Sequence, residues 1–128
     1  MKRPLHATDV APETWYAGTD REIRGRALCD VGGRAKVGVG QLELPPGSNT
    51  RPGHWHSDEE EHLYVLAGSA LLHLGDERHR LVAGDYACFP AGQAVPHHLE
   101  NDGDVAFVYL MIGERIAGDR VTWPEGDD

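Results

Sequence analysis

Turn-forming residues recur at short intervals between residues 42 and 112, and this spacing constrains the fold more than any other feature. The turns are rich in Gly, Pro, Asp and Asn, which favour the backbone conformations of tight turns. They lie at 45–47, 67–68, 75–77, 83–85, 90–92 and 101–104. The segments between them have the length of strands, and none has a sustained apolar stripe with the roughly 3.6-residue period of a helix. The spacing predicts an all-β fold, either a sandwich or a barrel.

The chain of 128 residues has no internal repeat or domain boundary, so we expect a single domain over residues 1–128. Residues 1–22 have no steady periodicity and predict an N-terminal arm packed on the edge of the body. Two glycines, Gly32 and Gly33, predict a turn, and residues 125–128 predict a solvated tail. The predicted strands cover 23–31, 36–44, 62–66, 69–74, 78–82, 86–89, 95–100 and 105–112.

The net charge excludes two classes of partner. Twelve basic residues against 21 acidic ones give a formal charge of -9. Phosphate backbones and anionic membrane surfaces repel such a chain. No segment reaches the roughly 18 apolar residues of a membrane helix, and no apolar signal segment follows the N-terminus. We therefore expect a cytoplasmic protein without nucleic-acid or membrane partners, and nothing indicates a disulfide between its two cysteines, Cys29 and Cys88.

The segment 53–68 carries half of a metal site. His54 and His56 are two residues apart, so both side chains would lie on the same face of an extended strand. A carboxylate, Glu61, follows five residues later and opens an apolar run in which Leu63 and Val65 share its parity. Two imidazoles and one carboxylate directed into the same interior form a partial ligand set for a divalent metal.

Two stretches of the chain together resemble the sequence motifs of the cupin superfamily. The first motif is matched by His54, His56, Glu61 and Gly68, with four residues between His56 and Glu61. The second motif is matched by Gly84, Pro90, Gly92, His97 and Asn101. The chain departs from the pattern at Ser48, where a glycine is usual, and by two extra residues between Gly92 and His97. The resemblance covers residues 42–110.

The resemblance implies a double-stranded β-helix, a small jelly-roll barrel with one divalent transition metal inside. Its ligands would be His54, His56, Glu61 and His97. Three imidazoles and one carboxylate suit Mn, Fe, Ni, Zn or Cu and leave coordination positions open. The extra residues before His97 leave His98 as an alternative ligand, although the parity of His97 with Leu99 and Asn101 favours His97.

The remaining polar candidates carry weaker signals. Tyr86 or Tyr109 could act as an acid or base near the metal, although core packing is the commoner role for such residues. His62 and His98 have the opposite parity to the expected ligands, which predicts outward-facing or supporting positions. The adjacent Glu59 and Glu60 are expected to be solvated. Residues that share the inward parity are Leu63, Val65, Leu99, Phe107 and Tyr109.

Open metal positions imply that a small molecule binds there. We hypothesise a metal-dependent enzyme that acts on a small polar molecule, as an isomerase, a lyase or a dioxygenase. The alternative is a non-catalytic cupin that holds a small molecule or a metal as a sensor or store. The closing segment, Asp119 to Pro124, resembles that of small single-domain bacterial cupins. Cupins commonly pair through edge strands, which predicts a homodimer.

Overall fold

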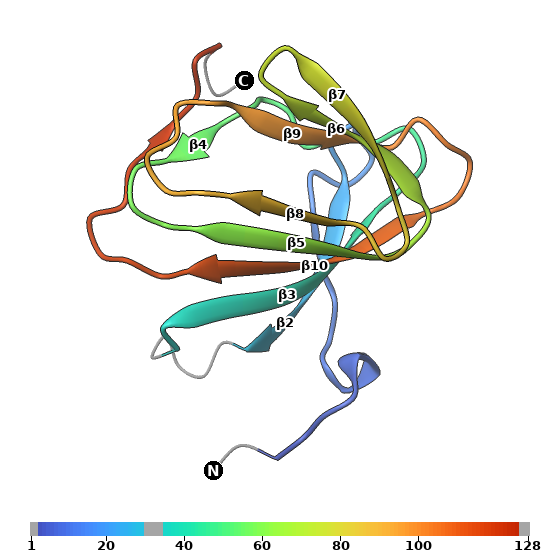
Figure 1. Cartoon of the computed structure of the whole chain (residues 1–128). Coiled ribbons are helices and arrows are strands. Elements are labelled where there is room, and N and C mark those ends of the chain that lie inside the picture. The colour runs from blue at the N-terminus through green and yellow to red at the C-terminus, as the bar shows by residue number, and fades with distance from the viewer. Residues whose placement is uncertain (1–2, 30–34, 126–128) are drawn as a thin grey trace.

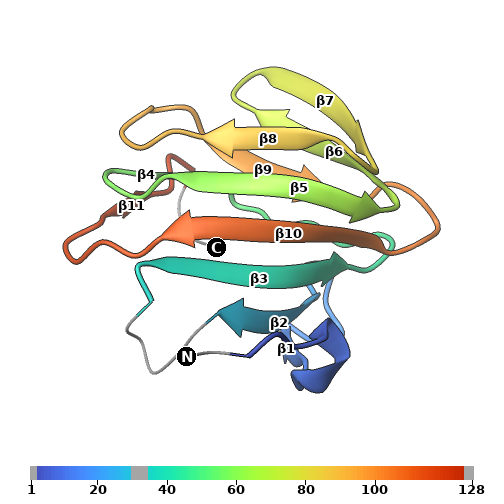
Figure 2. The same ribbon diagram turned by 60° about the horizontal axis from the view of Figure 1, so that its bottom comes forward.

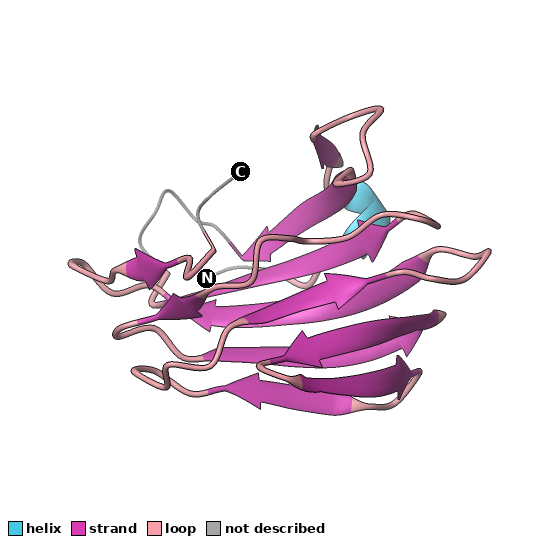
Figure 3. Cartoon of the chain, turned by 90° about the horizontal axis from the view of Figure 1, so that it is seen from above, coloured by secondary structure: helices cyan, strands magenta, loops and turns pink. Residues whose placement is uncertain are grey.

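The structure, a computed structural model, describes residues 3–29 and 35–125. Figure 3 shows that strands dominate this part of the chain, with one short 3-10 helix, η1 (Ala7–Asp9). The all-β prediction is therefore confirmed. Within the described ranges, no helix has the length and apolar character needed to cross a membrane.

The strands form two main sheets and one small ribbon. The large sheet has the order β1-β2-β3-β10-β5-β8, the second sheet β7-β6-β9, and the ribbon pairs β11 with β4. In chain order the strands are β1 (Glu13–Trp15), β2 (Ile23–Cys29), β3 (Val37–Leu44), β4 (Trp55–His56), β5 (Glu61–Ala67), β6 (Ser69–Leu74), β7 (Glu77–Val82), β8 (Tyr86–Phe89), β9 (His97–Glu100), β10 (Phe107–Glu114) and β11 (Val121–Thr122).

The order of the strands is that of a jelly roll. Strand β10 lies between β3 and β5, so three strands that are far apart in the sequence are neighbours in the large sheet. Figure 2 shows this sheet with β8, β5, β10, β3 and β2 side by side. Figure 1 shows the second sheet, β9, β6 and β7, above it. The two sheets close around one interior as a double-stranded β-helix.

The interior is filled by the side chains that alternation directs inward. Along β5, Leu63 and Val65 are buried whereas Tyr64 and Leu66 are exposed. The predicted inward residues are all buried, which confirms their parity. The full buried apolar core is Leu44, Leu63, Val65, Ala70, Leu72, Leu81, Phe89, Leu99, Phe107 and Tyr109.

Two residues of the predicted motifs stabilise the corners of the barrel. Gly68 has φ +81°, and a Cβ atom there would lie 2.3 Å from the carbonyl oxygen of Ala106. Only glycine fits this corner without displacing the backbone. Asn101 is buried, and its side-chain amide donates to the carbonyl oxygens of Leu44 and Val105 at 2.9 Å each. Asn101 is therefore a structural residue that joins three segments of the chain.

Most strands predicted from the sequence are present in the structure, but several of them begin or end at other residues than predicted. Strand β5 begins at Glu61, and β10 begins at Phe107 and continues to Glu114. The pair β4 and β11 was not predicted, because each strand has only two residues and its partner lies more than 60 residues away. The expected arm contains η1 and β1, and β1 extends the large sheet by pairing with β2. The predicted turn at Gly32 and Gly33, the last residues of the strand 23–31, and the tail beyond residue 125 lie outside the described residues.

Candidate metal centre

The four expected ligands come together inside one end of the barrel. The donor atoms of His54, His56 and Glu61 all lie within 4.8 Å of one another. Nε2 of His56 is 3.3 Å from Oε1 of Glu61, and Nε2 of His97 is 3.6 Å from the same oxygen. The rings of His54 and His97 have their centroids 4.7 Å apart. Residues separated by more than 40 positions thus converge on one carboxylate oxygen.

Backbone pairing brings these residues into position. His54 and His97 form an isolated antiparallel bridge, with hydrogen bonds of 3.3 and 3.1 Å between their backbone groups. His56 lies on β4, which pairs with β11, and Glu61 begins β5. The ring of His97 stacks on Phe89, with 3.8 Å between the centroids and an angle of 5°. The core thereby holds the plane of this imidazole.

The Oε1 atom of Glu61 is the clearest sign that this cluster fits a metal. The atom is buried and has no hydrogen-bond partner among the residues that the structure describes. Leaving a buried carboxylate oxygen unpaired is costly, unless a cation takes up its charge. Two imidazole nitrogens face the same oxygen. These donors match the hard and borderline ligands of a divalent transition metal.

The electrostatics of the cluster favour the protonation states that a metal requires. Burial, together with the nearby His97, lowers the pKa of His54, so its imidazole is neutral at pH 7. Burial alone would raise the pKa of Glu61, but the neighbouring His97, His56 and His54 outweigh it and the pKa lies below its usual value. A neutral imidazole and an ionised carboxylate are the forms that bind metal.

A second carboxylate, Asp119, supports the cluster from behind, and the sequence did not predict this role. Its Oδ2 atom is 2.7 Å from Nδ1 of His56, and its side chain is only 8% exposed. Its Oδ1 atom accepts hydrogen bonds from the backbone N–H groups of Asp58 and Glu59. Although burial acts to raise it, these hydrogen bonds and that of His56 lower the pKa of Asp119 to about 2. The ionised carboxylate directs Nε2 of His56 into the barrel, as carboxylates do behind metal-bound histidines.

The two tyrosine candidates lie in different places. Tyr86 is 58% exposed, and its hydroxyl group lies 2.6 Å from Nδ1 of His62 on the outer face of the large sheet. Tyr109 is 1% exposed and packs against Phe107, with 5.2 Å between the ring centroids. Burial and the charge of Glu61 raise the pKa of Tyr109. The structure therefore places Tyr86 outside the barrel and Tyr109 in the core.

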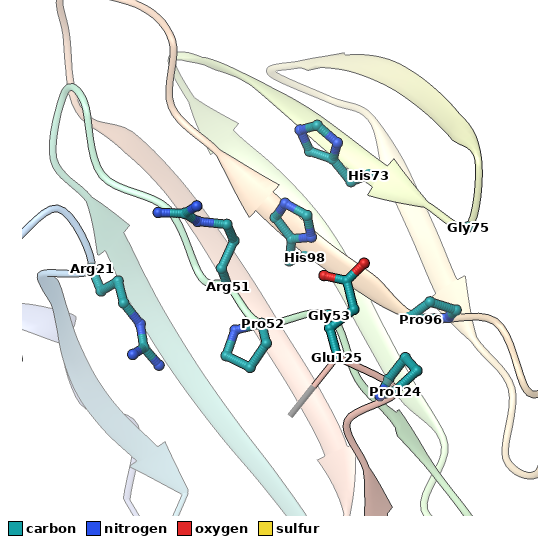
Figure 4. Close-up of a pocket in the computed structure, with 10 residues that line it drawn as sticks. All are labelled: Arg21, Arg51, Pro52, Gly53, His73, Gly75, Pro96, His98, Pro124 and Glu125. Atoms are coloured by element: carbon teal, nitrogen blue, oxygen red, sulfur yellow. The ribbon is translucent and has the colours of Figure 1, made fainter. Parts of the chain in front are cut away.

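His98 lies on the opposite face of β9 from His97. Its ring stacks on that of His73, with centroids 4.3 Å apart, in a surface pocket of about 290 Å³. Figure 4 shows the two histidines in this pocket with Arg51 and Glu125. Burial, followed by the nearby His73 and Arg51, lowers the pKa of His98 to about 4. The alternative ligand is thus turned away from Glu61, as its parity predicted.

Two cavities border the cluster. A narrow one of about 10 Å³ touches His56 and His97, which is space for about one water molecule. A larger groove of about 290 Å³ lies over β3 and β10. It includes Gly113, where a Cβ atom would lie 3.5 Å from Cγ of Glu61. The groove therefore adjoins Glu61 at Gly113, and its other residues include Trp15, Arg26, Gly38, Gly40, Leu42 and Met111.

The chain resembles proteins with different activities. It is 32% identical over 108 residues to quercetin 2,3-dioxygenase of Bacillus subtilis, a match that covers 73% of this chain and 32% of that protein. It is 29% identical over 98 residues to the tetracenomycin polyketide synthase protein TcmJ of Streptomyces glaucescens, covering 77% and 62%. The chain thus spans less than two thirds of the length of these relatives.

Similarity to solved structures supports the same fold. The crystal structure of a cupin-superfamily sugar phosphate isomerase from Silicibacter pomeroyi superposes with a TM-score of 0.86 at 24% identity. That match covers 98% of this chain and 83% of the other. The family model of the cupin domain matches residues 40–113, which include both motifs and all four expected ligands. The chain therefore belongs to the cupin family.

Proposed function

We propose that this protein is a metal-dependent enzyme that binds one divalent transition metal through His54, His56, Glu61 and His97. The observation that carries the proposal is the buried, unpartnered Oε1 atom of Glu61, which faces Nε2 of His56 and of His97. Mn, Fe, Ni, Zn and Cu all suit three imidazoles and one carboxylate. When bound, such a metal polarises a substrate oxygen as a Lewis acid or, if redox-active, supports oxygen chemistry.

The groove beside Glu61 indicates what kind of molecule binds. At Gly40 a Cβ atom would meet no atom closer than 3.7 Å, so a flat molecule can approach the backbone of β3 there. The side chains of Arg115 and Glu61 lie over the other two glycines, Gly38 and Gly113. Leu42, Met111 and Trp15 supply apolar contacts around them. We therefore propose a ligand with a flat apolar part in the groove and a polar group directed at Glu61. This refines the expectation of a small polar molecule.

The chain's own residues would orient this substrate and protect the reaction. Phe89 holds the plane of His97, and Asp119 fixes His56 through Nδ1. The buried core behind the cluster, including Leu63 and Tyr109, excludes water from that side. Among isomerase, lyase and dioxygenase activities, the similarity to quercetin 2,3-dioxygenase favours dioxygenation of an aromatic substrate.

The test combines metal analysis with turnover. We expect the purified protein to contain about one equivalent of a transition metal bound to the four ligands, and to consume a flavonol or catechol in air but not under anaerobic conditions. Gly40→Val adds a side chain to the groove without touching the ligands and should lower kcat/KM while leaving the metal content unchanged. Gln41→Val, at the next position of β3, is the matched control and should leave kcat/KM unchanged. Protein that binds no divalent metal under any loading condition would refute the proposal.

A non-catalytic binding protein is the second candidate. The observation in its favour is that the structure places Tyr86 outside the barrel and Tyr109 in the core, which leaves neither tyrosine as an evident acid or base. In that case metal-loaded protein would show a thermal shift with flavonols, keto acids or sugar phosphates but no turnover of any of them.

A homodimer in the cytoplasm remains our prediction for the assembly and its location. Trp15 in the edge strand β1 and Tyr16 directly after it are 43% and 60% exposed, and burying two such aromatic side chains would stabilise a subunit interface. Light scattering should give twice the 14.0 kDa mass of the chain. Trp15→Asp should convert the dimer to a monomer.

A further inference from the structure

A second group of metal-binding side chains lies on the outer surface of the large sheet. Donor atoms of Glu60, His62 and Cys88 all lie within 4.8 Å of one another. We propose that these three residues form a separate site for a thiophilic divalent cation, with Zn²⁺ as the best match. This inference is independent of the activity proposed for the barrel interior.

Strand register explains why these three residues meet. Glu60 and His62 are two positions apart, so both lie on the face opposite to Glu61. His62 of β5 is directly paired with Cys88 of the antiparallel neighbour β8. Side chains of such cross-strand partners have Cβ atoms roughly 5 Å apart. The sheet therefore presents one carboxylate, one imidazole and one thiol on a rigid surface.

Tyr86 orients the imidazole of this group. Its hydroxyl group lies 2.6 Å from Nδ1 of His62, and its ring stacks on the imidazole at 21°. Nε2 of His62 lies 2.7 Å from Oε2 of Glu60. In the metal-bound form the imidazole hydrogen would lie on Nδ1 and be donated to the Tyr86 oxygen, while Nε2 and Oε2 would bind the cation. The thiol proton of Cys88 would pass to solvent.

The donor types distinguish this site from the one inside the barrel. Thiolate, imidazole and carboxylate together are ligands of Zn²⁺, and solvent supplies the fourth position of a tetrahedron. The side chains of His62 and Glu60 are 33% and 47% exposed, so a hydrated ion reaches the site directly. The interior cluster, in contrast, contains no sulfur donor among its four proposed ligands.

Cobalt titration tests the proposal, because a thiolate bound to Co²⁺ gives a near-ultraviolet charge-transfer band that an imidazole and carboxylate site lacks. Under reducing conditions, we expect Co²⁺ at saturation to give the full-length protein a band with the intensity of one thiolate-bound ion, in addition to any Co²⁺ inside the barrel, and excess Zn²⁺ should remove the band. Cys88→Ser should abolish the band, and His62→Ala should weaken Co²⁺ binding at this site at least tenfold. Cys29→Ser, at the other free cysteine, is the matched control and should retain the band.

A double test separates the two sites. His56→Ala, which removes an expected interior ligand, should leave the charge-transfer band intact. The proposal is overturned if saturating Co²⁺ produces no band in the wild-type protein, if the band survives Cys88→Ser, or if Cys29→Ser removes it. Thermal melting of each metal-free variant shows whether a lost band reflects the ligand or the fold.

Discussion

Strand β9 presents two adjacent histidines to two different environments. His97 points into the barrel, is 6% exposed and lies 3.6 Å from Glu61. His98 points outward, stacks on His73 and lies in a surface pocket with two arginines. The two residues are chemically identical, so the difference comes from strand alternation alone.

The start of β5 and the residue before it give a second comparison, between the inward-facing Glu61 and the outward-facing Glu60 and His62. The inward Glu61 meets residues from β4 and β9, because the barrel closes around it and several strands converge on its interior. The outward residues lie beside side chains of the neighbouring strand, such as Cys88. The inner face thus joins distant segments into one ligand set, whereas the outer face combines near neighbours.

The largest expected difference between the two faces is in how much each histidine of β9 contributes to the metal affinity of the interior site. His97→Ala should reduce the affinity of the interior site by more than the roughly 100-fold that loss of a supporting residue costs. His98→Ala should leave that affinity unchanged. Isothermal titration with Mn²⁺, which binds poorly to thiolate sites, measures the interior site selectively. Equal losses in the two variants would mean that the parity of β9 is misassigned.

Replacing Asp119 should lower the metal affinity less than replacing a ligand does, but more than replacing any outward-facing residue does. Asp119→Asn keeps an oxygen for the backbone N–H groups but removes the charge behind His56. We expect a loss of metal affinity on the order of 10- to 100-fold. The control is Asp58→Asn in the loop between β4 and β5, since Asp58 is exposed and accepts only from Ser57 among the described contacts of its side chain. An unchanged affinity in Asp119→Asn would contradict a supporting role.

Substitutions at the adjacent residues 100 and 101 should also differ in how much they lower the free energy of unfolding. Asn101→Ala leaves the carbonyl groups of Leu44, which is buried, and of Val105 without their donor and should lower the free energy of unfolding by about 2 kcal/mol. Glu100→Ala removes a contact with His73 from a side chain that is 44% exposed and should cost less than about 1 kcal/mol. Urea denaturation of both variants measures the difference, and a reversed order would refute it.

The smallest expected effect is the pH dependence from the outward histidine. The folded pKa of His98 is about 4, below the ordinary value of 6.5. Between these values the unfolded chain binds a proton that the folded protein does not, so stability falls as the pH drops through this window. Solvent screening limits the effect to less than about 1 kcal/mol. Urea midpoints across the window should vary less in metal-free His98→Gln than in the metal-free wild type, whereas the exposed His79→Gln should behave like the wild type.

Local patterns were enough to predict much of the architecture and most of the proposed ligand set. Turn residues divided the chain into strands, and a period of two separated Leu63 and Val65 from Tyr64 and Leu66. The spacing of His54, His56 and Glu61 predicted three of the proposed ligands, and the resemblance to the second cupin motif supplied His97. The strand pattern and the spacing within each motif depend on positions close together in the chain, which is why the sequence reveals them.

The sequence by itself determined the strand pattern, the acidic charge and the residues that point inward. Only the tertiary structure decided that Asp119 lies behind His56, that Cys88 faces His62, and that the groove over β3 and β10 adjoins Glu61 at Gly113. The physical reason is distance along the chain. Asp119 is 63 residues from His56, and the groove joins β3 to β10, so these contacts exist only after the barrel closes.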